Sequence, residues 1–330
     1  MMDGMRSRSA AALALLAIVA LASCTGDARN DGDGASGSPS GMIAVVATPD
    51  LAVGDADRFS VGLPLDDRRT VSFGRVELSF SYLGTANEPT SPQPAGSTHE
   101  ARYVPTPGTP DASEDGGGPR VTSPSEARGI YQADDVRFDR SGFWQVEVAA
   151  DLQDLGRQRA TAAFEVLEEH ALPAPGDRAL ATRNHTIGAK GVPEEAIDSR
   201  AGVEGEIPDP ELHDVSIADA LERHVPIVVI FATPVYCVSL FCGPVTEAVE
   251  DLAARYDDRA VFIHVEIWRD FNAQPQVLNE AAADWLLRND DLTEPWLYTI
   301  DGDGTIVDRW ASVFDPEDVA RWLDGLPPRR

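Results

Sequence analysis

Two cysteines late in the chain have the type and spacing that thiol chemistry needs. Cys237 and Cys242 are separated by four residues. They follow a continuous apolar run at residues 226–232 and precede Pro244, which is typical of a helix start. The N–H groups at a helix N-terminus favour a thiolate, and a second thiol nearby can resolve a mixed disulfide. The pair therefore stands where thiol–disulfide exchange would require it.

A third cysteine, Cys24, ends an apolar segment at the N-terminus. Arg6 and Arg8 precede an apolar run at residues 10–22, which is too short to span a membrane as a mature helix. The segment ends in Leu-Ala-Ser-Cys, which resembles the lipobox of bacterial lipoproteins. In that family the cysteine is acylated and becomes the new N-terminus after cleavage. The alternative is an ordinary signal peptide that is cut nearby, with Cys24 incidental.

The lipobox resemblance implies where the mature chain resides. Residues 1–23 would be the signal peptide and Cys24 the lipidation site. Residues 24–41 contain Gly, Ser, Asp, Asn and Pro with few apolar residues, as expected of a flexible tether. We therefore expect a lipid-anchored protein on the extracytoplasmic face of the cell membrane. A disulfide can persist in such an oxidising compartment.

The composition is strongly acidic. The 330 residues include 27 basic and 55 acidic side chains, which give a net charge of −28. This charge argues against nucleic acid as a partner, because phosphate binding depends on Lys and Arg. It also argues against a general attraction to anionic lipid, so that membrane attachment would depend on the lipid anchor. The length predicts two domains, at about 100–200 residues each.

Short alternating strands characterise residues 42–168. Residues 76–82 alternate between apolar and polar side chains, which is typical of a half-buried strand. Short strands separated by turns predict an all-β sandwich. Gly-Ile-Tyr at 129–131 and Gly-Phe-Trp-Gln-Val at 142–146 resemble the small immunoglobulin-like domains of exported bacterial proteins. Residues 85–126 are rich in Pro, Gly, Ser and Thr and are expected to form a long mobile loop.

The pattern becomes alternating α and β beyond a linker and entry segment at residues 169–211. A helix capped at Ser216 opens the C-terminal domain, residues 212–330. The order that follows is β–α–β–α–β–β–α. It consists of strands at residues 226–232, 260–267, 296–300 and 305–310 and of helices after Pro244, at 278–287 and after Asp315.

This element order, with two cysteines between the first strand and its helix, resembles the α/β thioredoxin-like fold over residues 214–326. Phe231-Ala232 leads to a cysteine, and Thr293-Glu294-Pro295 precedes a strand, as in that family. Ala-Pro-Gly-Asp at residues 174–177 resembles the entry to exported thioredoxin-like oxidoreductases. The resemblance implies that Cys237 and Cys242 are the catalytic residues and form the redox disulfide.

The spacing of the pair departs from the family, which has Cys-x2-Cys. Residues five apart in one continuous helix are separated by about 8.5 Å. Bridged Cα atoms lie within about 7 Å, so Cys237 must lie on the loop before the helix if the bridge forms. In one alignment Cys237 is the nucleophile and Cys242 the resolving cysteine. In the other, Cys242-Gly243-Pro244-Val245 matches the family's Cys-Gly-Pro-Cys, and Val245 replaces the resolving thiol.

Pro295 matches the proline that this family holds in cis opposite its cysteines. A cis bond is essentially restricted to proline, because other residues lose about 2.5–4 kcal/mol. The resemblance implies that Glu294 and Pro295 bind substrate. The backbone of Glu294 would pair with a substrate peptide, and its side chain would give the rim a negative charge. The alternative is a trans proline that simply opens a strand.

The sequence thus predicts thiol–disulfide exchange on proteins or small thiols, with an electron donor that it does not identify. The rival is a redox-silent binding module in which the same disulfide is structural. A copper-handling protein is a third alternative, since it would use two cysteines and a histidine. However, His264 lies within a strand, where we expect a structural role, and no histidine follows it. We therefore predict no metal and no cofactor.

Overall fold

The computed structural model describes residues 41–54, 57–109, 117–237, 239 and 241–329. The predicted signal peptide, Cys24 and nearly all of the tether lie outside these residues.

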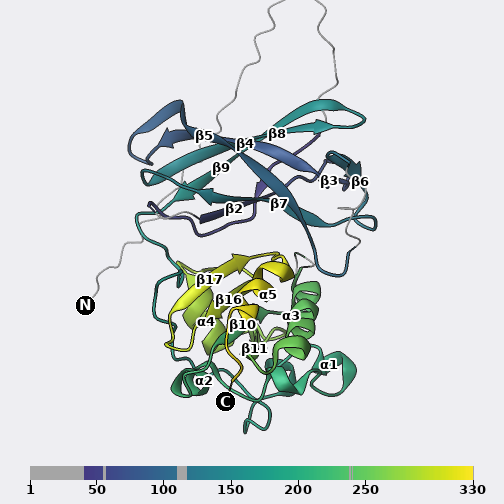
Figure 1. Ribbon diagram of the computed structural model, residues 1–330, viewed down its shortest axis with the longest axis vertical. Coiled ribbons are helices and arrows are strands. Elements are labelled where there is room, and N and C mark those ends of the chain that lie inside the picture. The colour runs from purple at the N-terminus through teal and green to yellow at the C-terminus, as the bar shows by residue number, and fades with distance from the viewer. Residues whose placement is uncertain (1–40, 55–56, 110–116, 238, 240, 330) are drawn as a thin grey trace, which may run out of the picture. The chain divides into compact units, whose positions relative to one another are not determined.

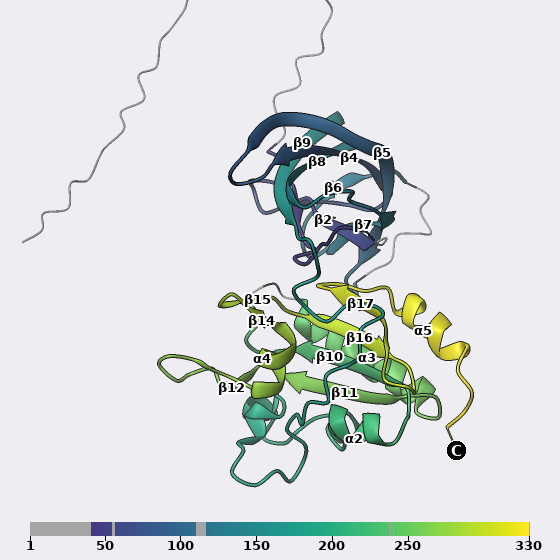
Figure 2. The ribbon, with the colours of Figure 1, turned by 90° about the vertical axis from the view of Figure 1, so that its left-hand side faces the viewer.

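Antiparallel strands make up the N-terminal region. Within the described residues, seven strands form one sheet in the order β1-β2-β7-β5-β4-β8-β9, and every pair is antiparallel. The end strands β1 and β9 also contact each other, so that the sheet curls into a nearly closed barrel (Figures 1 and 2). The strands are β1 (Val45–Val46), β2 (Asp57–Gly62), β4 (Arg75–Gly84), β5 (Pro89–Pro105), β7 (Gly129–Val136), β8 (Gly142–Leu152) and β9 (Gly156–Val166). A separate pair joins β3 (Thr70–Ser72) to β6 (Arg120–Thr122).

The core of this region follows from the predicted alternation. Val76, Leu78 and Phe80 of β4 are buried while the residues between them are exposed. The Phe59 ring lies 5.0 Å from those of both Phe80 and Phe164, at angles typical of favourable aromatic pairs. Burial of apolar and aromatic surface inside the curled sheet is therefore what stabilises this region.

The prediction that residues 85–126 form a loop is wrong for much of the segment, because residues 89–105 form strand β5. The proline-rich first part of β5 pairs only with β4, and its other edge is unpaired. Proline is tolerated on such an edge because no ladder hydrogen bond is lost. From Arg102 onward β5 also pairs with β7. It thereby joins the strands into one sheet, where the sequence predicted two facing sheets.

The C-terminal region is a mixed α/β structure around a four-stranded sheet in the order β11-β10-β16-β17. Strand β10 is parallel to β11 and antiparallel to β16, which is antiparallel to β17. The predicted strands and helices are confirmed. They are α2 (Ile217–Glu222), β10 (Ile227–Ala232), α3 (Cys242–Tyr256), β11 (Val261–Glu266), α4 (Glu280–Leu286), β16 (Trp296–Ile300), β17 (Ile306–Ala311) and α5 (Pro316–Asp324). Two short hairpins, β12–β13 (Trp268–Asp270, Val277–Leu278) and β14–β15 (Leu287–Arg288, Asp291–Leu292), flank α4.

Strand β10 is buried on both faces, as its unbroken apolar sequence predicts. Alternate residues Val228, Ile230 and Ala232 pack with α3 and α5. The others, which include Val229 and Phe231, pack with α2 and α4. Figure 2 shows α4 and α5 on opposite sides of the sheet. The end of β10 is therefore held firmly where the cysteine loop begins.

The segment predicted as a linker is irregular, but part of it is buried against the sheet. It contains the short helical turns η2 (Glu194–Ala196), α1 (Ala201–Glu204) and η3 (Pro210–Leu212). Asp198 and Ser199 are almost completely buried, and Ser199 Oγ accepts a hydrogen bond from Val235 N at 3.2 Å. The segment therefore supports the loop that carries Cys237.

One buried and one partly buried ion pair link the two regions. Arg309 of β17 is buried, and its Nη1 donates to Asp50 Oδ2 at 2.7 Å. Burial alone would raise the pKa of Asp50, but hydrogen bonds with His170 and Arg309 lower it to about 2. Arg58 also donates to Asp308 at 2.6 Å. These contacts hold the N-terminal region on the edge strand β17.

Candidate functional site

Cys237 and Cys242 form a disulfide at the N-terminus of α3. Cys242 is the first residue of the helix and is completely buried, whereas Cys237 is half-buried in the preceding loop. Their Cα atoms lie 6.0 Å apart. The prediction that Cys237 lies on the loop is therefore confirmed.

The first N–H group of α3 is directed at the sulfur of Cys237. Cys242 N donates to Cys237 Sγ at 3.4 Å, and Ser239 Oγ lies 3.1 Å from the same sulfur. Cys237 N in turn donates to Thr233 O at 3.1 Å, which anchors the loop to the end of β10. Donors at this position favour negative charge on Cys237 when the bridge is reduced.

Pro295 follows a cis peptide bond, as the sequence resemblance implied, and immediately precedes β16. Pro295 O accepts a hydrogen bond from Ser312 N at 2.9 Å. Trp296, the next residue, pairs with Phe231 of β10 and with Ala311 of β17. The backbone at Glu294 and Pro295 is thus fixed by the sheet.

The side chain of Glu294 completes a group that we call the cysteine cluster: Cys237, Cys242 and Glu294. A carboxylate oxygen of Glu294 lies within 4.8 Å of both sulfur atoms. Its Oε2 is buried and has no hydrogen-bond partner among the described residues. Burial and, next, the negative charge of Glu266 raise the pKa of Glu294 to about 7. Sequence reasoning identified Glu294 for its backbone and for a negative charge at the rim, and not for a buried carboxyl group beside the sulfurs.

A mainly apolar groove of about 520 Å³ opens beside the cysteine cluster. It runs between the cysteine loop, the segment before Pro295 and the first strand of the N-terminal region. Its lining consists of Val46, Ala47, Pro49, Ser239, Trp268, Leu292, Thr293, Glu294 and Ser312. The groove offers space for part of a larger molecule next to the half-buried sulfur of Cys237.

Glu266, at the end of β11, lies close enough to the cysteine cluster for its charge to act on Glu294. Its Oε2 accepts from Ser199 N at 2.9 Å, and its Oε1 accepts from Trp268 N at 3.2 Å. Burial raises the pKa of Glu266, against the opposing effect of the charge on His264. Because both of its oxygens already accept backbone hydrogen bonds, Glu266 has a positioning role in the site.

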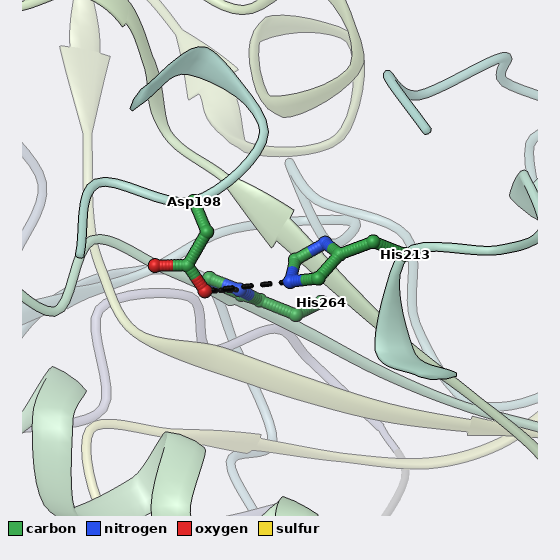
Figure 3. A group of neighbouring side chains, drawn as sticks. All are labelled: Asp198, His213 and His264. Atoms are coloured by element: carbon green, nitrogen blue, oxygen red, sulfur yellow. Dashed lines mark hydrogen bonds and ion pairs between the residues drawn. The ribbon is translucent and has the colours of Figure 1, made fainter. Parts of the chain in front are cut away.

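Figure 3 shows a second group of neighbouring polar side chains, which includes His264 of β11. We call it the histidine cluster: Asp198, His213 and His264, all completely buried. Asp198 Oδ2 lies 3.3 Å from His213 Nε2 and 3.2 Å from His264 Nδ1. The contact to His213 is close but does not have the geometry of a hydrogen bond. Neither ring nitrogen of His213 has a hydrogen-bond partner among the described residues.

The partners of His264 determine its protonation. Its Nε2 lies 3.1 Å from the carbonyl oxygen of Ala232, and its Nδ1 faces the carboxylate of Asp198. Both partners only accept, so both ring nitrogens must carry a proton. Burial lowers the pKa of His264, but the hydrogen bond and the charge of Asp198 outweigh burial and raise it. Asp198 and His264 therefore form a buried ion pair that fixes the end of β10.

Two histidines and a carboxylate are ligand types that could hold a divalent metal. Here, however, Arg200 occupies both oxygens of Asp198, with Nη2 at 2.7 Å from Oδ2 and Nε at 3.1 Å from Oδ1. A metal would have to displace this guanidinium and the proton on His264. The donor set therefore fits a self-contained ion network better than a metal site.

Sequence reasoning predicted a structural role for His264 but did not find its partners. Asp198 and His213 come from the irregular entry segment and its boundary, where no periodic pattern marks a buried residue. The only sequence signal for Asp198 and His213 is that they are polar residues next to short helical turns.

No helix among the described residues is both long and apolar enough to cross a membrane. No protein-family model matches the chain, and no curated protein matches it.

Proposed function

We propose that this protein is a lipid-anchored thiol–disulfide oxidoreductase of the extracytoplasmic face, with a thioredoxin-like C-terminal domain. The observation that carries the proposal is the disulfide at the N-terminus of α3, next to a cis proline and a groove. The order β10-α3-β11-α4-β16-β17-α5 supports the thioredoxin-like fold, because it is the order that the resemblance implies. Substrates are the disulfides or thiols of proteins or small molecules.

The exposure of the two sulfurs supports Cys237 as the nucleophile. Reduced Cys237, as a thiolate, attacks one sulfur of a substrate disulfide, which releases the first substrate thiol and leaves a mixed disulfide. The Cys242 sulfur then attacks Cys237, which forms the protein disulfide and releases the second thiol. Two electrons pass from the protein to the substrate, and the reverse sequence oxidises a substrate dithiol.

The immunoglobulin-like assignment of the N-terminal region is part of the same proposal. Its antiparallel pairs and the buried Trp144 support it. Under this assignment, β5 joins the two halves of an immunoglobulin-like sandwich into one curled sheet. Attachment through acylated Cys24 rests on the lipobox alone, and a Cys24→Ala variant that remained in the membrane fraction would exclude it.

Trapping of a mixed disulfide tests the proposed exchange. A Cys242→Ser variant should accumulate a mixed disulfide with a thiol substrate, because attack can occur and resolution cannot. The matched Cys237→Ser variant should trap none. Trapping only with Cys237→Ser would assign the nucleophile to Cys242. Trapping with neither variant, when both are folded, would favour the binding module with a structural disulfide.

A further inference from the structure

The buried thiol of Cys242 needs a proton acceptor before its sulfur can attack. Cys242 is completely buried at the start of α3, whereas Cys237 is half-buried in the preceding loop. Solvent therefore has little direct access to the thiol proton. A group on the protein that lies close to this sulfur would remove the proton faster than solvent could.

We propose that the carboxyl group of Glu294 exchanges the proton of the Cys242 thiol in each half-reaction, as the general acid and base of the site. The inference rests on the proposed exchange reaction and adds a catalytic residue to it. A Glu294 oxygen lies within 4.8 Å of both sulfurs, and Oε2 has no other partner among the described residues. Glu294 is held by the end of a paired strand, so its carboxyl group is positioned before the reaction begins.

The groups around Glu294 support this role. Cys237 and Cys242 face it from the loop and α3, and Glu266 acts on it from β11. Burial and the charge of Glu266 raise the pKa of Glu294 to about 7. A carboxyl group with this pKa both accepts and donates a proton at neutral pH, which a half-reaction in either direction requires.

The proton balance of the step is simple. The carboxylate of Glu294 takes the proton from Cys242, and the resulting thiolate attacks the Cys237 sulfur of the mixed disulfide. The bond from Cys237 to the substrate sulfur breaks, and the Cys237–Cys242 bond forms. The leaving substrate thiolate receives the proton from Glu294. In oxidation of a substrate dithiol the same proton moves in the opposite direction.

The reaction of the reduced protein with Ellman's disulfide separates the two sulfurs. With one equivalent of reagent, attack by Cys237 releases one coloured thiolate, and resolution by Cys242 releases the second. The full chain would carry Cys24→Ser in every variant, so that only two thiols react. Glu294→Gln is the test variant because it keeps size and polarity. Glu247→Gln, an exposed glutamate on α3, is the matched control.

Glu294→Gln should slow the second release by at least about tenfold at pH 7 and change the first release by less than about threefold. The rate of the second release in the unmutated chain should rise with pH around 7, and this inflection should be absent from Glu294→Gln. The control should behave as the unmutated chain.

A second release that is unchanged or faster in Glu294→Gln would overturn the proposal, because a merely negative neighbour would hinder thiolate formation. A missing second release in the unmutated chain would instead contradict the exchange reaction itself. Circular dichroism of each variant identifies any rate change that results from misfolding.

Discussion

The cysteine cluster and the histidine cluster each bring three side chains and one carboxyl group together in the described part of the chain, yet they differ in whether that carboxyl group has partners. In the histidine cluster, Arg200 and His264 neutralise Asp198. In the cysteine cluster, Glu294 Oε2 has no hydrogen-bond partner among the described residues, and a groove opens beside it. A buried carboxylate whose charge is paired stabilises a fold, whereas an unpaired carboxyl group beside a reactive bond is available for chemistry.

The largest effect should come from removing the paired carboxylate of the histidine cluster. Asp198→Ala leaves the buried His264 imidazolium without its counter-ion and removes one of the carboxylates that pair with Arg200. It should therefore lower the free energy of unfolding by about 3–5 kcal/mol. Urea unfolding followed by tryptophan fluorescence measures this loss. Asp284→Ala, at an exposed position of α4, is the control and should change stability by less than about 0.5 kcal/mol. If Asp198→Ala lowered the free energy of unfolding by no more than the control does, the ion pair would not be structural.

The histidine cluster should also make stability depend on pH. The pKa of His264 is raised above its ordinary value of 6.5 in the folded state. The stabilisation is therefore complete below about pH 6.5 and is lost as the pH rises through the folded pKa. The difference in unfolding free energy between the unmutated chain and His264→Gln should shrink from pH 6 to pH 9. A difference that stayed constant would contradict the doubly protonated state.

Glu294 should also make stability fall as the pH rises, with a smaller effect, because its charged form is the one that burial disfavours. Its pKa rises from 4.5 to about 7 on folding, so the folded state holds more protons than the unfolded state between these values. Stability conferred by this site therefore falls as the pH rises from 4.5 to 7. Glu294→Gln should unfold at the same urea concentration as the unmutated chain near pH 4.5 and at a higher one at pH 7. The reverse order at pH 7 would mean that the carboxylate has a stabilising partner.

The smallest effect should come from metal. Because Arg200 already occupies Asp198, the melting temperature of the oxidised protein should be the same in EDTA and in excess Zn²⁺. Oxidised protein is used so that the cysteines cannot bind zinc. A rise in melting temperature with Zn²⁺ that the His213→Ala substitution abolishes would show that the histidine cluster is a metal site.

Local patterns predicted the elements that position the cysteines, because the apolar run of β10 and the helix signals of α3 and α5 are contained in short stretches of sequence. The position of Cys237 followed from the reach of a disulfide. The partners of His264 and the burial of the Glu294 carboxyl group beside the sulfurs could not be predicted, since they depend on contacts between residues far apart in the sequence. Strand β5 was missed because an edge strand tolerates prolines that usually indicate a loop.

The reduction potential of the Cys237–Cys242 couple tests the central claim most directly. The sulfur of Cys237 is half-buried, receives the first N–H of α3 and lies beside a groove, all of which favour the reduced thiolate. Equilibration of the full chain with glutathione or dithiothreitol buffers should therefore give a value above about −300 mV. A value well below about −300 mV would mark the bond as structural and contradict the account of this site as a working redox centre.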